Sequence, residues 1–217
     1  MALQTVFDRL LGVEDDGPAH LDPGLLLRAV QSQLVALQGW RHPLGFLHVE
    51  LTSLVKVPQG CRFRLHIWDN TNGTIDELGD LHDHVWDLRS WVLHGALIDV
   101  TYGPTRSDSG EFWGSRITYG ARNVAGERLR YDLNRIQERR IEAGNYYTIP
   151  YGTVHSSSPA LVPTVTLLVS FENPAAALEG PLVLSPSSQG GGITAERVQV
   201  SADELMESID EVLRIVK

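Results

Sequence analysis

The chain has 217 residues, of which 42% are hydrophobic and 21% charged, values typical of a globular domain with a substantial core. A formal net charge of −9 and an isoelectric point near 5.3 argue against a nucleic acid or an anionic membrane as the partner, so we expect neither. The single cysteine, Cys61, excludes an internal disulfide, and we recognise neither a signal peptide nor a membrane-spanning run. We therefore expect a cytoplasmic protein.

The first predicted element is a helix over residues 22–38. Asp22 is a suitable N-cap and Pro23 suits the first helical position. The apolar residues that follow keep helical spacing: Leu26, Val30, Leu34 and Leu37. We assign residues 1–45 to an N-terminal helical extension.

From residue 46 the pattern changes to short runs rich in β-branched and aromatic residues, separated by Gly, Pro, Asn and Asp. These runs include FLHVELTSLV, CRFRLHIW, RSWVLHGALIDVTY, NYYTIP and TVTLLVSF. Many short strands in series, without helices between them, indicate an antiparallel sandwich or barrel. The predicted fold class is therefore mostly β, with the barrel over residues 46–175.

The C-terminal part, residues 176–217, is predicted to hold a loop and a helix. SPSSQGGG, at 185–192, has the composition of a flexible loop. Ser201 and Glu204 form a capping box at the start of the helix. Its apolar stripe consists of Leu205, Ile209, Val212, Leu213 and Val216. We expect the barrel or a second subunit to cover this stripe, so a homodimer is one possibility.

Two histidines, His82 and His84, stand one residue apart in GDLHDHVWDLRSWVLHG, just before an apolar run. In a strand, residues i and i+2 point to the same face, with Cα atoms about 6.7 Å apart. Two imidazoles can converge over that span on one metal ion, at about 2.1 Å from each nitrogen. A solvated strand end is the alternative interpretation of this pair alone.

A second stretch, GNYYTIPYGTVH at 144–155, strengthens the metal interpretation. The two stretches together resemble the two motifs of the cupin family. The second motif is matched by Gly144, Pro150, Gly152 and His155, and the first by His82, His84 and Gly95.

Four positions depart from the family pattern. Gly79 lies closer to His82 than the first motif asks, and Leu88 and Arg89 stand where its glutamate ligand would fall. The asparagine that often ends the second motif is replaced by Pro159. The missing glutamate leaves a site of three neutral histidines.

The resemblance implies a double-stranded β-helix, the jelly-roll or cupin barrel, with a metal held by His82, His84 and His155. The HDH sequence and the strand FRLHIW are also similar to the three-histidine thiol dioxygenases. That similarity favours Fe(II) as the cofactor, with Zn, Ni or Mn as alternatives. The late segment TLLVSFENP lacks the tyrosine of that branch, so we do not assign cysteine as the substrate.

The function implied is that of a non-haem iron(II) oxygenase or dioxygenase, which would use O2 and a small, carboxylate-bearing metabolite. The alternatives are a non-redox metal-dependent cupin, such as an isomerase, lyase or hydrolase, and a cupin that binds a small ligand without catalysis. Dependence of the reaction on O2 distinguishes the oxygenase from the non-redox enzyme.

Two further residues are candidates for a catalytic role. Arg89, if it points inward, would bind a substrate carboxylate with its planar fork; otherwise it faces outward, and a shift of one residue in register decides between the two. Tyr146 and Tyr147 precede the second turn, and alternation sends one of them to the pocket wall. We take Tyr147 as the candidate.

Other polar and aromatic residues have competing interpretations. In CRFRLHIW we expect the apolar set to face the interior, with the arginines Arg62 and Arg64 solvated; the alternative is that Arg64 and His66 line a wet pocket. We expect Asp87 to be a surface or turn carboxylate; the alternatives are a fourth metal ligand or an acceptor for a histidine N–H. Trp86 and Trp91 are expected in the core.

Overall fold

The computed structural model describes residues 3–11, 22–34, 37–42, 45–69, 81–118, 124–174, 180–186 and 198–216. Within these ranges, no helix combines the length and the apolar character needed to cross a bilayer.

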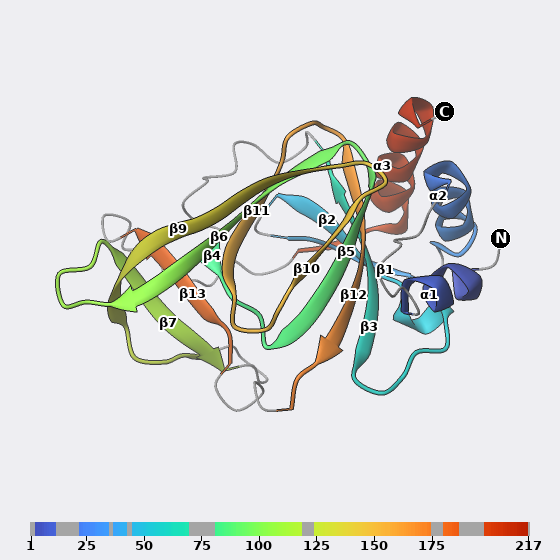
Figure 1. Ribbon diagram of the computed structural model, residues 1–217. Helices are drawn as coiled ribbons and strands as arrows, with labels where there is room; N and C mark the ends of the chain where they lie inside the picture. Colours follow the sequence, from blue (N-terminus) through green and yellow to red (C-terminus); the bar gives the residue numbers. More distant parts are fainter. Residues whose placement is uncertain are drawn as a thin grey trace.

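Helices lie at the two ends of the described chain and strands fill the middle (Figure 1). The helices are α1 (Leu3–Leu11), α2 (Pro23–Gln31) and α3 (Ala202–Ile215), with a short 3-10 turn at Thr52–Leu54. The strands up to the second histidine stretch are β1 (Gln38–Arg41), β2 (Phe46–Glu50), β3 (Cys61–Trp68), β4 (Leu81–His82), β5 (Trp86–His94), β6 (Ala96–Arg106), β7 (Phe112–Thr118), β8 (Val124–Ala125) and β9 (Leu129–Glu142). The remaining strands are β10 (Tyr146–Ile149), β11 (Val154–Pro159), β12 (Thr164–Glu172), β13 (Leu182–Pro186) and β14 (Val198–Val200).

The described strands form two seven-stranded sheets, and all their pairings are antiparallel. The first, which we call the helix-side sheet, has the order β10-β5-β12-β3-β2-β1-β14. The second, the arm sheet, has the order β13-β4-β11-β6-β9-β7-β8, and β13 also pairs with β7. That extra pairing closes the arm sheet into a ring. The architecture is the mostly β jelly-roll barrel that the sequence predicts.

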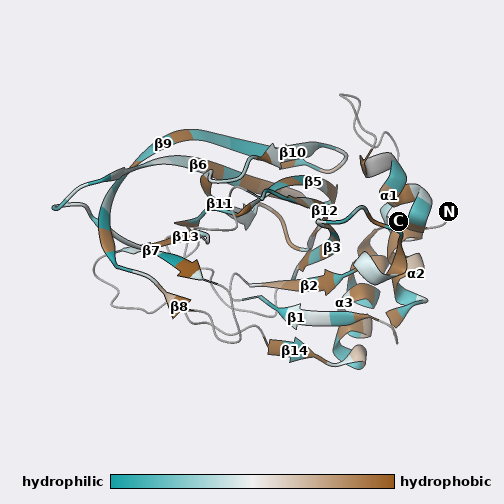
Figure 2. Ribbon diagram, turned by 90° about the horizontal axis from the view of Figure 1, so that it is seen from below, coloured by the Kyte–Doolittle hydropathy of each residue, from teal (hydrophilic) through white to brown (hydrophobic). Residues whose placement is uncertain are grey.

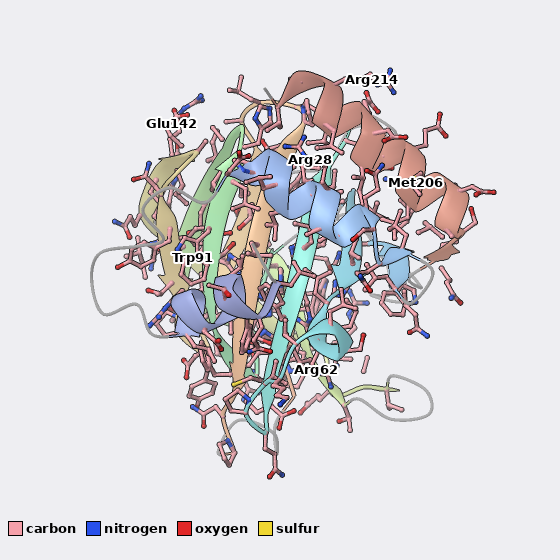
Figure 3. The ribbon with its side chains drawn as sticks, turned by 90° about the vertical axis from the view of Figure 1, so that its right-hand side faces the viewer. Arg28, Arg62, Trp91, Glu142, Met206 and Arg214 are labelled. Carbon is pink, nitrogen blue, oxygen red and sulfur yellow. The ribbon has the colours of Figure 1, made fainter. Side chains whose placement is uncertain are left out.

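All three helices lie on one side of the barrel, away from β7, β8 and β9 (Figure 2). They cover the outer face of the helix-side sheet, and Figure 3 looks onto this face, with α2 (Arg28 labelled) and α3 (Met206 labelled) across the strands. Apolar side chains of the helices and of β2, β3, β5 and β12 form one buried cluster there. Leu27, Leu65 and Ile209 are fully buried members of it. The helices are thus part of the core.

A second apolar cluster lies on the inner face of the helix-side sheet, toward the arm sheet. It includes Leu88, Tyr147, Ile149 and Leu168, and β6 and β9 add Leu97 and Ile141. Side chains alternate along each strand, so β3, β5 and β12 contribute to both faces. The helix-side sheet is therefore buried on both sides.

The helix predicted over 22–38 is shorter in the structure: α2 ends at Gln31, and Gln38 instead begins strand β1, which pairs with β2 and β14. Asp22 caps α2 as expected, its side chain accepting from the Leu25 N–H at 3.1 Å. Helix α1 was not foreseen. Gly39 of β1 lies so close to β14 that a Cβ there would be 2.9 Å from the Val200 side chain.

The predicted barrel range of 46–175 is too narrow, since β1, β13 and β14 also join the sheets. Only Ser185 and Pro186 of the predicted loop at 185–192 are described, and they belong to β13. Helix α3 begins as predicted, with the capping box of Ser201 and Glu204 in place. The middle of its apolar stripe, Leu205, Ile209 and Val212, is buried against the rest of the helical core.

Candidate metal centre

The three histidines singled out by the sequence come together between the two sheets. His82 ends β4 and lies directly opposite His155 of β11 in an antiparallel pair. His84 follows two residues later, after the strand has ended. One ligand atom from each of the three lies within 4.8 Å of the others. The chain positions 82 and 155 are brought together by strand pairing alone.

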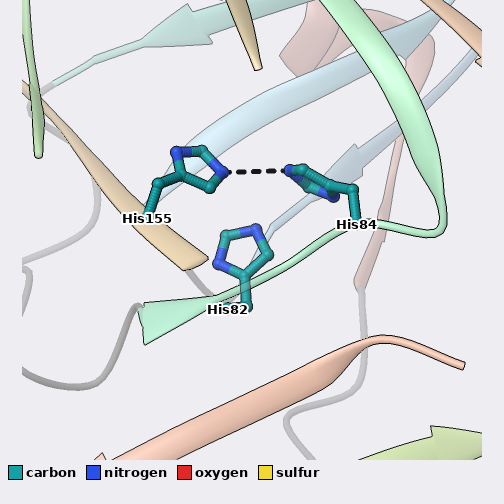
Figure 4. A group of neighbouring side chains, drawn as sticks. All are labelled: His82, His84 and His155. Atoms are coloured by element: carbon teal, nitrogen blue, oxygen red, sulfur yellow. Dashed lines mark hydrogen bonds between the residues drawn. The ribbon is translucent and has the colours of Figure 1, made fainter. Parts of the chain in front are cut away.

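The nitrogens of this group have the spacing that a shared ion requires. The Nε2 atoms of His84 and His155 are 3.1 Å apart (Figure 4). The ring centroid of His82 lies 4.6 Å from that of His84 and 5.0 Å from that of His155. Two nitrogens that each bind one ion at about 2.1 Å lie no more than about 4.2 Å apart, so the His84–His155 pair fits. Three neutral nitrogens suit Fe(II), Zn(II) or another divalent transition metal.

The site favours neutral imidazole at His84. Burial lowers the pKa of His84 well below its ordinary value, and the neighbouring His82 and His155 lower it further. Only the neutral form has a nitrogen lone pair for a metal.

Asp83, the residue between His82 and His84, stabilises the local fold through hydrogen bonds to neighbouring strands. Asp83 is buried and faces β7 and β13, where it accepts from the Leu182 N–H at 2.5 Å and from Arg116 Nη1 at 2.8 Å. Burial raises the pKa of Asp83, although the Leu182 N–H and Arg116 act in the opposite direction. Asp83 thus fixes the short strand β4 in the arm sheet, which orients the histidines on either side of it.

A buried carboxylate that the sequence did not single out contacts the third histidine. Asp99 of β6 is fully buried, and its Oδ1 lies 3.0 Å from His155 Nδ1. Ser157 Oγ donates to the same oxygen at 3.0 Å, and Arg139 Nε donates to Oδ2 at 2.9 Å. Burial by itself would raise the pKa of Asp99, but the hydrogen bond with His155 and the charges of His155 and Arg139 bring it below its ordinary value. An acidic residue in the apolar strand ALIDVTY was the only sequence signal for it.

The histidine group opens into a cavity between the sheets with a volume of about 90 Å³, the space of about three water molecules. The lining consists of His42, Phe46, His48, Arg64, His66, His82, His84, Trp86, Leu88, Tyr147, Ile149, His155, Ser157 and Leu168. Six of the chain's eight histidines are in this set. Polar groups that converge within otherwise apolar and aromatic walls are typical of a ligand site.

The expectation for β3 was wrong. Its apolar set is buried, but under the helices; on the opposite face Arg62 is exposed, whereas Arg64 and His66 face the barrel interior. Arg64 is 8% exposed and lines the cavity together with His66. The helices cover one face of the strand, which leaves the other face to the barrel interior. The alternative of a polar, strand-lined pocket is therefore the observed one.

Tyr147 lies where its candidate role requires. Its ring lines the cavity, and burial raises the pKa of its phenol to about 12, against the effect of the nearby Ser90 and Ser157 hydroxyls. The guanidinium of Arg139 stacks over the ring at 5.1 Å. Tyr146 points the other way and packs on the helical core. Tyr147 is therefore a neutral hydroxyl group at the cavity wall.

Arg89 does not reach the histidine group. It pairs across strands with Thr148 and Val169 and shares the outer face of the sheet with Trp91, because Leu88 and Ser90 take the inward positions. It lines a separate surface depression with Asp87 and Pro150. The outward orientation considered for Arg89 is thus the observed one, and the cavity's arginine is Arg64 of β3.

The remaining candidates fall on both sides of the sheet. Asp87 is exposed and accepts from the Tyr151 N–H at 2.9 Å, so it does not contact a histidine in the candidate centre. Trp91 is a core residue, as expected. Trp86 is instead part of the cavity wall, stacked on His84 with ring centroids 5.3 Å apart. Gly79 lies outside the described residues.

No family model and no curated protein sequence matches the chain. Among solved structures it is similar to an oxalate decarboxylase (14% identity over 62% of this chain and 27% of that one, TM-score 0.37). It is also similar to KdgF from Halomonas sp. (17% identity, 63% of this chain and 88% of that one, TM-score 0.33). A third is HEPD from Streptomyces albus, solved with 2-hydroxyethylphosphonate and Fe(II) (12% identity, 65% and 25%, TM-score 0.37).

The chain spans about a quarter of the oxalate decarboxylase and HEPD chains. These likenesses concern the fold alone. The predicted resemblance to cupins is confirmed at that level by the antiparallel barrel and by the three histidines gathered inside it.

Proposed function

We propose that this protein, a cupin by its barrel and its three-histidine group, is a metal-dependent enzyme, specifically a non-haem iron(II) oxygenase acting on a small, carboxylate-bearing metabolite. The observation that carries the proposal is the convergence of His82, His84 and His155 on one cavity wall, with two of their Nε2 atoms 3.1 Å apart. Three protein ligands on one side leave the cavity side open, which is the arrangement of a catalytic rather than a structural site.

A divalent ion held by these histidines would supply open coordination positions for substrate and O2 and, being bound by neutral ligands, would keep its double positive charge. The chain's own residues define what can enter. Phe46, Trp86, Leu88 and Leu168 form apolar walls that limit water around the histidines. The small volume supports a substrate of few atoms.

Arg64 supports a carboxylate on that substrate. Its guanidinium lies over the Trp86 ring, 5.5 Å from the centroid, and its charge contributes to the lowered pKa of His84. On the other side, its Nε is 3.5 Å from Glu50 Oε2, which fixes the direction of the side chain. A guanidinium binds a carboxylate through two parallel hydrogen bonds, so Arg64 would orient a substrate between itself and the histidines.

Tyr147 supports proton handling on the same wall. Its phenol stays protonated at neutral pH, since its pKa is about 12. It is therefore a hydrogen-bond donor within the cavity, able to bind a negatively charged oxygen of the substrate.

The test combines metal analysis with O2 consumption. Protein purified without added metal is analysed for elemental content, reloaded with Fe(II) under anaerobic conditions, and supplied with small carboxylates in an oxygen electrode. We expect about one metal ion per chain and O2 consumption that depends on one class of carboxylate. Turnover that proceeds equally without O2, or with Zn(II), would replace the oxygenase with the non-redox alternative; saturable binding without turnover would indicate a ligand-binding protein.

A further inference from the structure

We propose that Asp99 is a positioning residue that commits His155 to bind metal through Nε2, and that Arg139 and Ser157 hold Asp99 in place for this purpose. The inference rests on the proposed metal site. It assigns a function to the ion pair between the buried Asp99 and the partly exposed Arg139, which the proposed reaction does not otherwise use.

The contact between Asp99 and His155 determines the tautomer of the imidazole. An ionised carboxylate only accepts hydrogen bonds, so at 3.0 Å from Oδ1 the Nδ1 atom of His155 carries the proton. Nε2 then carries the lone pair. It is this atom that lies 3.1 Å from His84 Nε2, on the side of the ring facing the other ligands. The carboxylate thus acts through His155 and has no contact with the ligand side of the ring.

Arg139 and Ser157 fix the carboxylate. Arg139 donates from Nε to Oδ2 at 2.9 Å, and its Nη2 lies 2.8 Å from the same oxygen. Ser157 donates to Oδ1 at 3.0 Å. The Arg139 guanidinium is in turn held by the Thr148 carbonyl, to which Nη2 donates at 3.1 Å. With all these bonds in place, Asp99 has little freedom to rotate.

The strand register explains why this network can form in the interior. Asp99 of β6 lies opposite Ser157 of β11 on one side and opposite Arg139 of β9 on the other. His155 is two residues from Ser157 on the same face. Three neighbouring strands therefore bring these four polar side chains together on one face. Arg139 balances the charge of the carboxylate, so burial requires neither a proton on Asp99 nor a permanent positive charge on His155.

Two readouts test the role. In metal-free protein, imidazole ¹⁵N shifts report which ring nitrogen of His155 is protonated, and we expect Nδ1–H in the wild type and a mixture of tautomers in Asp99→Asn. In a chelator competition with Co(II), we expect the Asp99→Asn variant to bind about 10- to 100-fold more weakly, the usual effect of losing such a partner. Ser157→Ala should shift both readouts in the same direction by less.

The matched control is Glu142→Gln, which breaks the exposed Arg140–Glu142 pair in the same strand as Arg139. It should change neither readout. An Nε2–H tautomer of His155 in the wild type would overturn the inference, and so would a Co(II) affinity unchanged in Asp99→Asn, even if that variant melts at a lower temperature. Absence of Co(II) binding by the wild type would refute the proposed metal site and with it this inference, an outcome distinct from the other two.

Discussion

The two faces of the helix-side sheet are both buried, but the outer one packs apolar residues under the helices, whereas the inner one combines an apolar cluster with polar groups that line a cavity. On β3, Phe63, Leu65 and Ile67 face the helices within an apolar cluster. Between them, Arg64 and His66 face the barrel and line its cavity. The outer face carries the hydrophobic stabilisation of the fold, since it combines three helices and five strands in one core. The inner face bears polar groups whose desolvation opposes folding.

Burial alone therefore does not distinguish the hydrophobic core from the candidate metal site in this chain. A polar wall inside a barrel is retained where it has a chemical use, and here it ends at the three histidines. If the division is correct, substitutions on the outer face should change stability without changing chemistry. Substitutions of inner-face side chains that line the cavity next to the histidines should mainly change the chemistry.

The largest effect is expected at the metal ligands. Replacing His82, His84 or His155 by alanine removes one of three nitrogens, so we expect the variants to be purified without stoichiometric metal and without activity. His94→Ala is the control, because His94 lies on β5 outside the cavity lining. Elemental analysis checks the prediction, and equal metal content in all four variants would contradict it.

On the outer face, Leu65→Ala should cost about 2 to 5 kcal/mol of unfolding free energy, because it leaves a cavity in a fully buried cluster. Denaturant unfolding of the metal-free protein measures this. The folded variant should still bind metal with wild-type affinity. A metal affinity that falls along with stability would show that the two faces are not independent.

One residue along the same strand, Arg64→Lys should keep stability and lose activity. Lysine retains the charge but not the fork, so loss of a charge-assisted hydrogen bond of about 1.5 to 3 kcal/mol predicts a ten- to hundred-fold fall in kcat/KM. Arg62→Ala is the matched control, since Arg62 is exposed on the same strand. Wild-type kinetics in Arg64→Lys would remove the carboxylate anchor from the proposal.

The unfolding free energy should depend on pH in acid because of Glu50, a carboxylate on the inner face. Burial would raise the pKa of Glu50, but His48, Thr52 and the Arg64 charge outweigh it and lower the pKa from 4.5 to about 2. The unfolded chain therefore binds the proton more readily, so this carboxylate stabilises the fold above about pH 4.5, and the contribution is lost as pH falls toward 2. Glu50→Gln should flatten the stability curve between these limits, and an unchanged slope in acid unfolding would count against it. The effect is moderate, because Glu50 remains partly exposed to solvent.

The smallest effect is expected at Arg89. Since it lies on the outer face and lines only a surface depression, Arg89→Ala should leave kcat/KM and metal content at wild-type values. Its unfolding free energy should change by about 0.5 kcal/mol or less. A clear loss of activity would contradict this prediction and indicate that Arg89, and not Arg64, binds the substrate carboxylate.

The barrel class, the capped C-terminal helix and the gathering of His82, His84 and His155 in one group could be predicted from the sequence. Alternating runs, the capping box and the spacing of the two histidine stretches are local signals, so they can be read without knowing which strands pair. The limits of the elements were less accessible: the helix predicted over 22–38 ends at Gln31, and Gln38 instead begins β1, which pairs with β2 and β14 on either side.

Which face of each strand lines the cavity depends on tertiary packing and could not be predicted from the sequence. Alternation says that Arg64 and Leu65 point in opposite directions, as do Leu88 and Arg89, but it does not say which direction is inward. The helices pack on the apolar face of the strand, so the polar face points into the barrel interior. Asp99 and Arg139 were hidden for the same reason: strand pairing brings Asp99 to His155, 56 residues away, and Arg139 to Asp99, 40 residues away, and no local pattern encodes such contacts.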